Sequence, residues 1–332
     1  MNNDFTFLSV EQISGLKKLN LIAKRGTSAR MTDYAVILGC HGNDYKAKTG
    51  NMVGCYWLNS PNRKNEIITS FIDENGQIDS DRTDQRFYGG RPVLSFSSFD
   101  ATFVDKVCGR TSDGLLEVEY GMYPQTAAPK NLQNKLEKLF KKGSLRKTGG
   151  CYTFDSVDNS FSCYKKSFEP SNYDEYELEG KRYIRAKAKF STYSMMNKFG
   201  KMHTVLSNGQ KYKSDDYVWI EVSPIKWLVS EEDKLMITEN IIFSGIQYKH
   251  AKNFDKPFNG IDIKIFMDNY FSKQILQHRS VGLDEKDNSQ KQSIENEIKK
   301  LEQLKKELEK EKNIKNNPPT EQKNNDYNGR SI

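Results

Sequence analysis

The feature that most constrains this fold is a set of short strand motifs that fall into two groups along the chain. The first group is Tyr56–Pro61, Asn75-Gly76 and Gly90–Leu94, and the second is Gly121–Gln125, Pro224–Val229 and Leu235–Thr238. Asn-Gly tolerates the positive φ angles of a type I′ turn and therefore predicts a hairpin. Pro92 and Pro224 fix the backbone where strands begin. Trp57 and Trp227 are expected in the core, because tryptophan buries so much area.

Three further stretches have helical spacing. Residues 8–20 repeat apolar side chains after Ser9, which can cap a helix. Lys130–Lys142 places leucines on one side and lysines on the other, and Gly143 is positioned to end it. Residues 261–276 repeat apolar side chains in the same way. With the strand motifs, these stretches predict an α+β fold of mixed and antiparallel sheets with flanking helices and long loops.

The remaining segments are expected to be strands and connections. Tyr34–Leu38 is an apolar run ending before a glycine, which is typical of a buried strand. Lys181–Phe190 alternates polar and apolar side chains, as a half-buried strand does. Residues 98–114 are a polar connector. Residues 148–180 are rich in Ser, Asp, Tyr and Gly and predict long loops with short strands.

The sequence changes character after about residue 285. From 286 to 314, Ile and Leu recur among alternating Glu and Lys, which predicts a charged helix. Its imperfect heptads are those of a weak coiled coil, so 289–312 could assemble a homo-oligomer. The polar tail 315–332 follows and is expected to be disordered.

The composition predicts a folded protein outside the membrane. Hydrophobic residues make up 36% of the 332 residues and charged residues 29%, with 17 Tyr and 18 Phe available for a core. No apolar run reaches the roughly 18 residues that a membrane span needs. The N-terminus has neither the basic start nor the apolar stretch of a signal peptide. We therefore expect a cytoplasmic protein, or a virion-associated one if a phage encodes it.

The cysteines and histidines do not predict a metal centre. The five cysteines are an odd number without a CxxC pair, and we interpret them as buried free thiols. The four histidines are scattered without ligand spacing. The acidic run from Asp73 to Asp84 departs from the order of calcium loops. We expect no metal, no cofactor and no catalytic residue.

One segment carries most of the net charge of +7. Between Lys130 and Lys147 there are seven basic residues against Glu137 alone. Such a segment can neutralise the phosphates of a nucleic acid, although no aromatic residues are interleaved for base stacking. A solvated helix face packed on a sheet is the alternative. The candidate polyanion-binding residues are Lys135, Lys138, Lys141, Lys142, Arg146 and Lys147.

Together, the two groups of motifs resemble an uncharacterised bacterial and phage domain family. That family is related to the C-type-lectin-like fold of sulfatase-modifying (formylglycine-generating) enzymes. Its members begin with Gly-x-Tyr-Pro-Gln and Pro-Ile-x-Trp-x-Val strands, which match Gly121–Gln125 and Pro224–Val229. They finish with Tyr-Trp-Leu-Arg-Ser-Pro and Gly-x-Arg-Pro-x-Leu strands, which match Tyr56–Pro61 and Gly89–Leu94, with Asn59 in place of the usual Arg.

The resemblance implies that the end of the family domain comes first in this chain. Residues 30–97 would correspond to its C-terminal half, 116–278 to its N-terminal half and 98–115 to a connector. In lectin-like folds the first and last strands lie side by side, so rejoining the chain there is tolerated. We expect one circularly permuted domain over 1–285. Two domains, each with a degenerate half, are the alternative.

The resemblance also implies where a function would lie. Lectin-like folds present a loop-rich segment on a rigid scaffold, and here that segment would lie between Trp57 and Arg91. Its charged and aromatic groups suit recognition of a protein partner. We expect a non-enzymatic binding module of this kind. The candidate ligand-binding residues are Arg63, Lys64, Arg82, Arg86, Tyr88 and Arg91, and a buried ion pair is the alternative role for Arg91.

Two other functions stay open at this stage. One is a phage or mobile-element factor that binds a nucleic acid or nucleoprotein through the basic segment. The other is an enzyme like the formylglycine generators, which depend on a reactive cysteine pair. Cys40 and Cys55 would be that pair, but their surroundings are apolar or rich in glycine, and we expect no adjacent base to activate either thiol.

Overall fold

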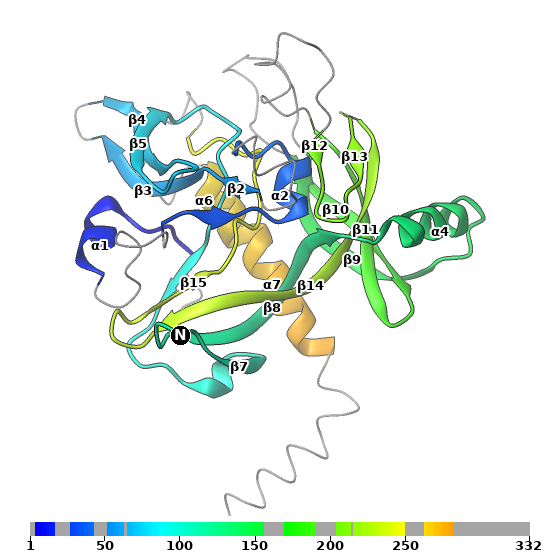
Figure 1. The fold of residues 1–332 in the computed structure, drawn as a ribbon. Coiled ribbons are helices and arrows are strands. Elements are labelled where there is room, and N and C mark those ends of the chain that lie inside the picture. The colour runs from blue at the N-terminus through cyan, green and yellow to red at the C-terminus, as the bar shows by residue number, and fades with distance from the viewer. Residues whose placement is uncertain are drawn as a thin grey trace, which may run out of the picture. The chain divides into compact units, whose positions relative to one another are not determined.

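The computed structural model of the protein describes residues 4–16, 27–42, 52–62, 65–155, 169–189, 204–213, 215–249 and 262–281 (Figure 1). The chain divides into two compact units, Met1–Arg279 and Ser280–Ile332. The predicted charged helix 286–314 and the tail 315–332 lie outside the described residues. The fold class is α+β with antiparallel sheets, as the sequence predicts. Among the described residues, no helix is both long and apolar enough to cross a membrane.

The largest sheet has eight strands, and all of its pairings are antiparallel. Its main path, in spatial order, is β6 (Val93–Ser95), β15 (Leu235–Thr238), β14 (Tyr217–Ser230), β11 (Lys181–Lys187), β10 (Glu169–Leu178) and β9 (Arg146–Asp155). β8 (Leu116–Ala127) pairs with the other edge of β14, and β7 (Lys106–Arg110) pairs with β8. The long strand β14 therefore holds the sheet together, because it pairs with β11 near its start and β15 near its end.

A second sheet of three strands contains β3 (Tyr56–Asn62), β4 (Asn65–Ile72) and β5 (Ile78–Arg82) in that order. Two small ladders join β1 (Ala29–Arg30) to β2 (Val53–Gly54), and β12 (Thr204–Val205) to β13 (Lys211–Tyr212). Figure 1 shows the three-stranded sheet to one side of β8 and β14. The permuted-domain interpretation predicts both β3 and β6 in the main sheet. The prediction is right for β6 and wrong for β3.

The two sheets nevertheless share one hydrophobic core. Trp57 on β3 and Trp227 on β14 both have 0% exposure and belong to one continuous group of buried side chains. On β14 the buried Ile225, Trp227 and Val229 alternate with more exposed neighbours, as the period of two requires. The prediction that both tryptophans lie in the core is confirmed. The described part of the chain therefore does not form two separate cores.

The helices begin where the sequence signals predict them except in one place, but the helix predicted over 8–20 already ends at Gly15, since Leu16 has an extended backbone. α1 (Val10–Gly15) begins at Ser9, which forms a capping box with Gln12. α4 (Lys130–Lys141) and the continuous helical segment α6 (Asp262–Phe266), η4 (Met267–Phe271) and α7 (Ser272–Val281) lie where helical spacing predicts them. A single 3-10 turn, η1 (Ala101–Phe103), interrupts the predicted connector.

The exception is α2 (Asp33–Ile37), because a strand is predicted over Tyr34–Leu38. All five helical residues are buried, so this apolar run has no polar face to reveal its period. The hydroxyl of Thr32 accepts a hydrogen bond from the amide of Ala35 and caps the helix. The cap residue, rather than periodicity, was the available signal.

Two predicted connections are also wrong. β7 occupies part of 98–114. The ten-residue strand β9 extends into 148–180 from Arg146, and the ten-residue strand β10 lies within that range, where only short strands are predicted. Their loop-like composition hides an alternation of burial, since Cys151 and Thr153 are both at 0% exposure on β9. Glu175 on β10 is also buried, at 1%. Polar residues on a buried face mask a strand from composition alone.

Candidate functional site

The predicted recognition residues between Trp57 and Arg91 do not form one exposed group. Arg63 and Lys64 lie outside the described residues. Arg82 on β5 is exposed, and its guanidinium donates to both carboxylate oxygens of Asp84, with Nε at 3.0 Å and Nη2 at 2.6 Å. Arg86 is partly buried, and its carbonyl accepts a hydrogen bond from the amide of Gly245. Of the charged candidates that the structure describes, Arg82 is thus the one placed as an exposed contact.

Tyr88 is part of the core rather than a surface anchor. It is 6% exposed, and its ring stacks on Phe71 at 4.2 Å and meets Trp57 edge-on at 4.5 Å. Its hydroxyl donates to Asp81 at 2.7 Å. Burial, with that carboxylate, raises the pKa of Tyr88. A partner could contact this side chain only if the core opened.

Arg91 is also structural, and it is 4% exposed. Its Nε donates to the carbonyl of Thr238 at 2.9 Å, and Nη1 donates to the hydroxyl of Tyr56 at 3.3 Å. Its guanidinium also lies 5.4 Å from the centre of the Tyr56 ring. The structural alternative for Arg91 is therefore supported, although a carbonyl and a phenol take the place of the expected carboxylate.

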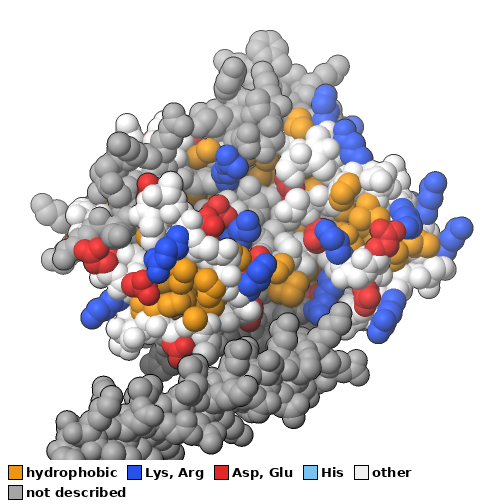
Figure 2. Space-filling view, turned by 60° about the horizontal axis from the view of Figure 1, so that its bottom comes forward, with side chains coloured by type: hydrophobic (Ala, Val, Ile, Leu, Met, Phe, Trp, Pro, Cys, Tyr) orange, Lys and Arg blue, Asp and Glu red, His pale blue; other side chains and the backbone are white. Residues whose placement is uncertain are grey.

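The six candidate polyanion-binding residues are all exposed, but most of them contact carboxylates. Lys147 lies 2.6 Å from Asp174, Arg146 lies 3.7 Å from Glu177, and Lys135 pairs with Glu179. Lys141 pairs with Glu137 within α4. The charge count along 130–147 includes Glu137 but omits the other three acidic groups, because Asp174 and Glu177 lie on β10 and Glu179 lies in the turn after it. Figure 2 likewise shows acidic and basic side chains interspersed on the face it draws.

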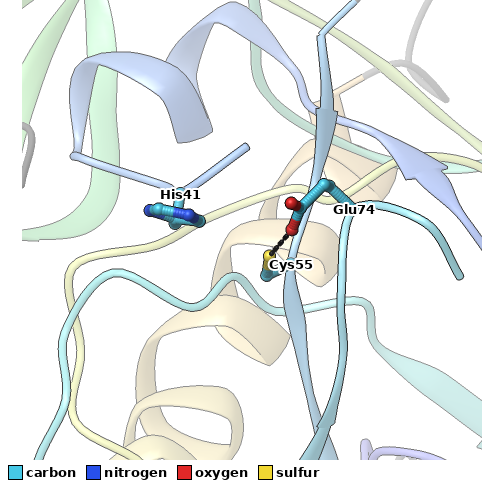
Figure 3. A group of neighbouring side chains, drawn as sticks. All are labelled: His41, Cys55 and Glu74. Atoms are coloured by element: carbon cyan, nitrogen blue, oxygen red, sulfur yellow. Dashed lines mark hydrogen bonds between the residues drawn. The ribbon is translucent and has the colours of Figure 1, made fainter. Parts of the chain in front are cut away.

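A group of possible metal ligands lies elsewhere, at His41, Cys55 and Glu74 (Figure 3). One ligand atom from each of these side chains lies within 4.8 Å of the other two. The thiol of Cys55 donates to Oε2 of Glu74 at 3.3 Å, and the His41 ring stands on the other side of the sulfur in Figure 3. Cys55 is buried, and the other two side chains are partly buried. The group joins the segment after α2, the start of β3 and the turn between β4 and β5.

The turn that carries Glu74 differs from the predicted type I′ hairpin. The amide of Gly76 donates to the carbonyl of Asp73, and the amide of Asp73 donates to the carbonyl of Gln77. Only Gly76 has a positive φ, of 81°, whereas Asn75 does not. This is the pattern of a type I turn followed by a glycine bulge. One carboxylate oxygen of Asp73 accepts from the amides of Asn75 and Gln77 and fixes the loop.

The predicted enzymatic pair, Cys40 and Cys55, lie close together. The thiol of Cys40 donates to the carbonyl of Cys55 at 3.6 Å, and both cysteines are free. The expectation that neither has an adjacent base is wrong, because His41 follows Cys40 directly in the chain, and Glu74 and His41 lie beside Cys55. Burial raises the pKa of Cys40 to about 12 and also raises the pKa of Cys55. Neither thiol is thereby activated as a thiolate nucleophile.

Sequence spacing does not reveal the His41, Cys55 and Glu74 group. The three residues are far apart along the chain, on three different elements, with no HxxH or CxxC pattern to mark them. The nearest available signal is Gly42 and Gly54, each adjacent to one ligand and each in a position where backbones approach closely. Comparisons with protein-family models, with curated proteins and with solved structures found no match.

Proposed function

We propose that this protein is a non-enzymatic binding module that recognises a protein partner. The proposal keeps the circularly permuted, lectin-like scaffold suggested by the motifs. It moves the recognition surface to the outward face of the β4–β5 hairpin. The observation that carries it is that Ile78, Ser80 and Arg82 are exposed on one face of β5.

The register places three more side chains on this face. Ile68 pairs with Arg82 and Ser70 pairs with Ser80, and both are partly buried, whereas Ile72, which pairs with Ile78, is fully buried. Ile78 is 42% exposed, and it is one of five large hydrophobic side chains that are exposed among the described residues. Isoleucines, serines and an arginine on a rigid sheet resemble the mixed composition of protein interfaces. Arg82 is the candidate anchor, since arginine is enriched at energetically important contacts.

The edge of β5 favours docking on its face over strand addition. Asp79 accepts a hydrogen bond from the amide of Ser80 at 2.8 Å, and Asp81 accepts one from the amide of Arg82 at 2.7 Å. These acidic side chains occupy amides that an added strand would need, and charged groups of this kind protect sheet edges from unwanted pairing. A partner therefore meets Ile78 and Arg82 from the side of the sheet face.

The test is a quantified capture from the native host with wild type, an Ile78→Ser/Arg82→Ala variant and a Tyr217→Ser control. Tyr217 is 48% exposed on β14, outside the proposed surface. We expect at least one specific partner to be lost by the double variant and kept by the control. If the folded double variant keeps every partner, the β4–β5 surface is not the binding site.

The nucleic-acid alternative has weaker support, because four of its six candidate residues contact carboxylates. Binding to generic duplex DNA at low salt, with affinity that falls steeply as salt rises, would favour it instead. In that case the affinity for DNA should be unchanged in the Ile78→Ser/Arg82→Ala variant. The Lys138→Ala and Lys142→Ala variants should bind DNA more weakly. These two lysines have no carboxylate partner among the described residues.

A further inference from the structure

We propose that His41, Cys55 and Glu74 form a binding site for a divalent cation of the zinc type. This site is separate from the β4–β5 surface and does not depend on the proposed recognition function. Its ligands are one imidazole, one thiolate and one carboxylate, contributed by three elements (Figure 3).

The spacing of the three side chains fits a tetrahedral ion. Zinc binds cysteine sulfur at about 2.3 Å and carboxylate oxygen at about 2.1 Å, which puts the two ligand atoms about 3.6 Å apart at a tetrahedral angle. The Cys55 sulfur and Glu74 Oε2 are 3.3 Å apart. All three ligand atoms lie within 4.8 Å of one another, so an inward movement of about 1 Å would complete the coordination.

The ligand types select among cations. Calcium takes six to eight oxygen ligands, and magnesium keeps an octahedral shell of oxygens, so a single carboxylate with a thiol and an imidazole does not suit either ion. Thiolate and imidazole favour zinc and its neighbours in the transition series. The nearby carboxylates do not change this assignment, because Asp73, Asp79 and Asp81 accept hydrogen bonds from backbone amides.

The backbone holds His41 and Cys55 in position without a metal. The amide of Cys55 donates to the carbonyl of His41 at 2.9 Å, and the amide of His41 donates to the carbonyl of Phe87 at 2.6 Å. Their chain neighbours, Gly42 after His41 and Gly54 before Cys55, form an antiparallel bridge. A Cβ at Gly42 would lie 2.5 Å from the carbonyl oxygen of Val53, so only glycine permits this approach.

Glu74 is positioned by contacts of its own turn. The hydroxyl of Thr27 donates to the carbonyl of Gly76 at 2.6 Å, and it occupies the space that a Cβ at Gly76 would need. Asp73 fixes the same turn from its other side through the amides of Asn75 and Gln77. Two ligands thus lie on paired backbone segments, and the third lies in a braced turn. Such support for the ligands is what a preorganised metal site requires.

Binding would tie the tip of the β4–β5 hairpin to the segment after α2. A cation that binds only the folded protein stabilises it, because the unfolded chain does not bring the three ligands together. Three protein ligands also leave one tetrahedral position for water or an outside donor. The described residues therefore provide one ligand fewer than a closed structural zinc site.

The experiment uses the full chain, purified under reducing conditions and freed of metal with a chelator. Titration with Co²⁺ alone should give one equivalent of binding with a sulfur-to-cobalt charge-transfer absorption, and Zn²⁺ should displace the cobalt and remove that absorption. We expect Cys55→Ser to abolish the charge-transfer band. We expect His41→Ala and Glu74→Gln each to weaken Zn²⁺ binding by at least tenfold.

Cys40→Ser is the matched control, since Cys40 is a buried thiol next to the site but outside the group of three. It should retain both the band and the affinity. Glu74→Gln keeps the proposal testable if the Cys55 variant does not fold, because Glu74 is partly exposed in a turn. Absence of saturable Co²⁺ or Zn²⁺ binding by the folded wild type would overturn the proposal. Unchanged affinity in the folded Glu74→Gln and His41→Ala variants would do the same.

Discussion

Replacing Gln133 with methionine should strongly destabilise the docking of α4 on the main sheet. Gln133 is 7% exposed and binds the backbone of Trp219 from both ends of its amide. Nε2 donates to the Trp219 carbonyl at 2.7 Å, and Oε1 accepts from the Trp219 amide at 2.8 Å. The regular pairing of β8 with β14 extends only to Ile220, and beyond it the glutamine oxygen takes the place of the Ala128 carbonyl as the acceptor for the Trp219 amide.

The size of the effect follows from the partners that remain. Nε2 of Gln133 also donates to the carbonyl of Ala128 at 3.2 Å, so the substitution removes three hydrogen bonds. After it, the Trp219 carbonyl still accepts from the amide of Ala128 at 2.9 Å, and the Ala128 carbonyl still accepts from Nδ2 of Asn208 at 2.6 Å. The Trp219 amide keeps no partner. A buried unpaired amide costs about 1–3 kcal/mol, and each of the other two lost hydrogen bonds adds about 1 kcal/mol. Methionine recovers about 1 kcal/mol through its apolar surface. The expected loss in the free energy of unfolding is therefore about 2–4 kcal/mol.

Urea unfolding followed by tryptophan fluorescence measures this loss. Asn134→Met is the matched control, because Asn134 is the next residue of α4 and is exposed. The control should change the free energy of unfolding by less than about 0.5 kcal/mol. A loss below about 1 kcal/mol for Gln133→Met, with an unchanged denaturant slope, would refute the argument that the side chain completes the ladder.

Two further predictions concern β8 and α4. Gly121 has a φ of +69°, and a Cβ there would lie 2.3 Å from Ile275. Gly121→Ala should therefore destabilise the fold by at least about 1–2 kcal/mol. A loss of less than about 0.5 kcal/mol in urea unfolding would contradict this. Hydrogen bonding from Arg185 lowers the pKa of Glu137 below its usual 4.5. A lowered carboxyl pKa stabilises the fold above the unfolded value, and this contribution is lost as pH falls. The wild type should therefore have a higher free energy of unfolding than Glu137→Gln, and this difference should shrink below about pH 4.5. Urea unfolding at several pH values measures the difference. A difference that stays constant with pH would show that the prediction is wrong.

The sequence predicts the elements whose pattern is local. The capping box at Ser9, the amphipathic face of α4 and the alternation along β11 can each be read from neighbouring residues. The wholly buried helix α2 and the strands β9 and β10 cannot, because their identity depends on what packs against them. Propensity is a weak guide where tertiary burial decides the structure.

The candidate sites divide in the same way. Exposure of the lysines on α4 follows from their place on a polar face, but their pairing with Asp174, Glu177 and Glu179 requires the fold. Tyr88 has the residue type of a recognition anchor, yet the three-stranded sheet encloses it. Conversely, no spacing rule connects His41 with Cys55 and Glu74, because ligands from separate elements converge only through tertiary structure.

The contacts of Arg91 bear directly on the proposed permutation. Gly90, Arg91 and Pro92 belong to the first group of motifs, whereas Thr238 belongs to the second. Arg91 donates to the backbone carbonyl of Thr238. The amide of Thr238 in turn donates to the carbonyl of Pro92 at 3.1 Å.

Gly90 also packs directly on Phe243, just beyond the second group of motifs. A Cβ at Gly90 would lie 2.2 Å from the ring of Phe243, so this close contact requires glycine. Residues of the first group of motifs therefore contact the strand of the second group and the residues just beyond it. Because Arg91, Pro92 and Gly90 pack against Thr238 and Phe243, the two groups belong to one folded unit, even though β3 lies in a separate sheet.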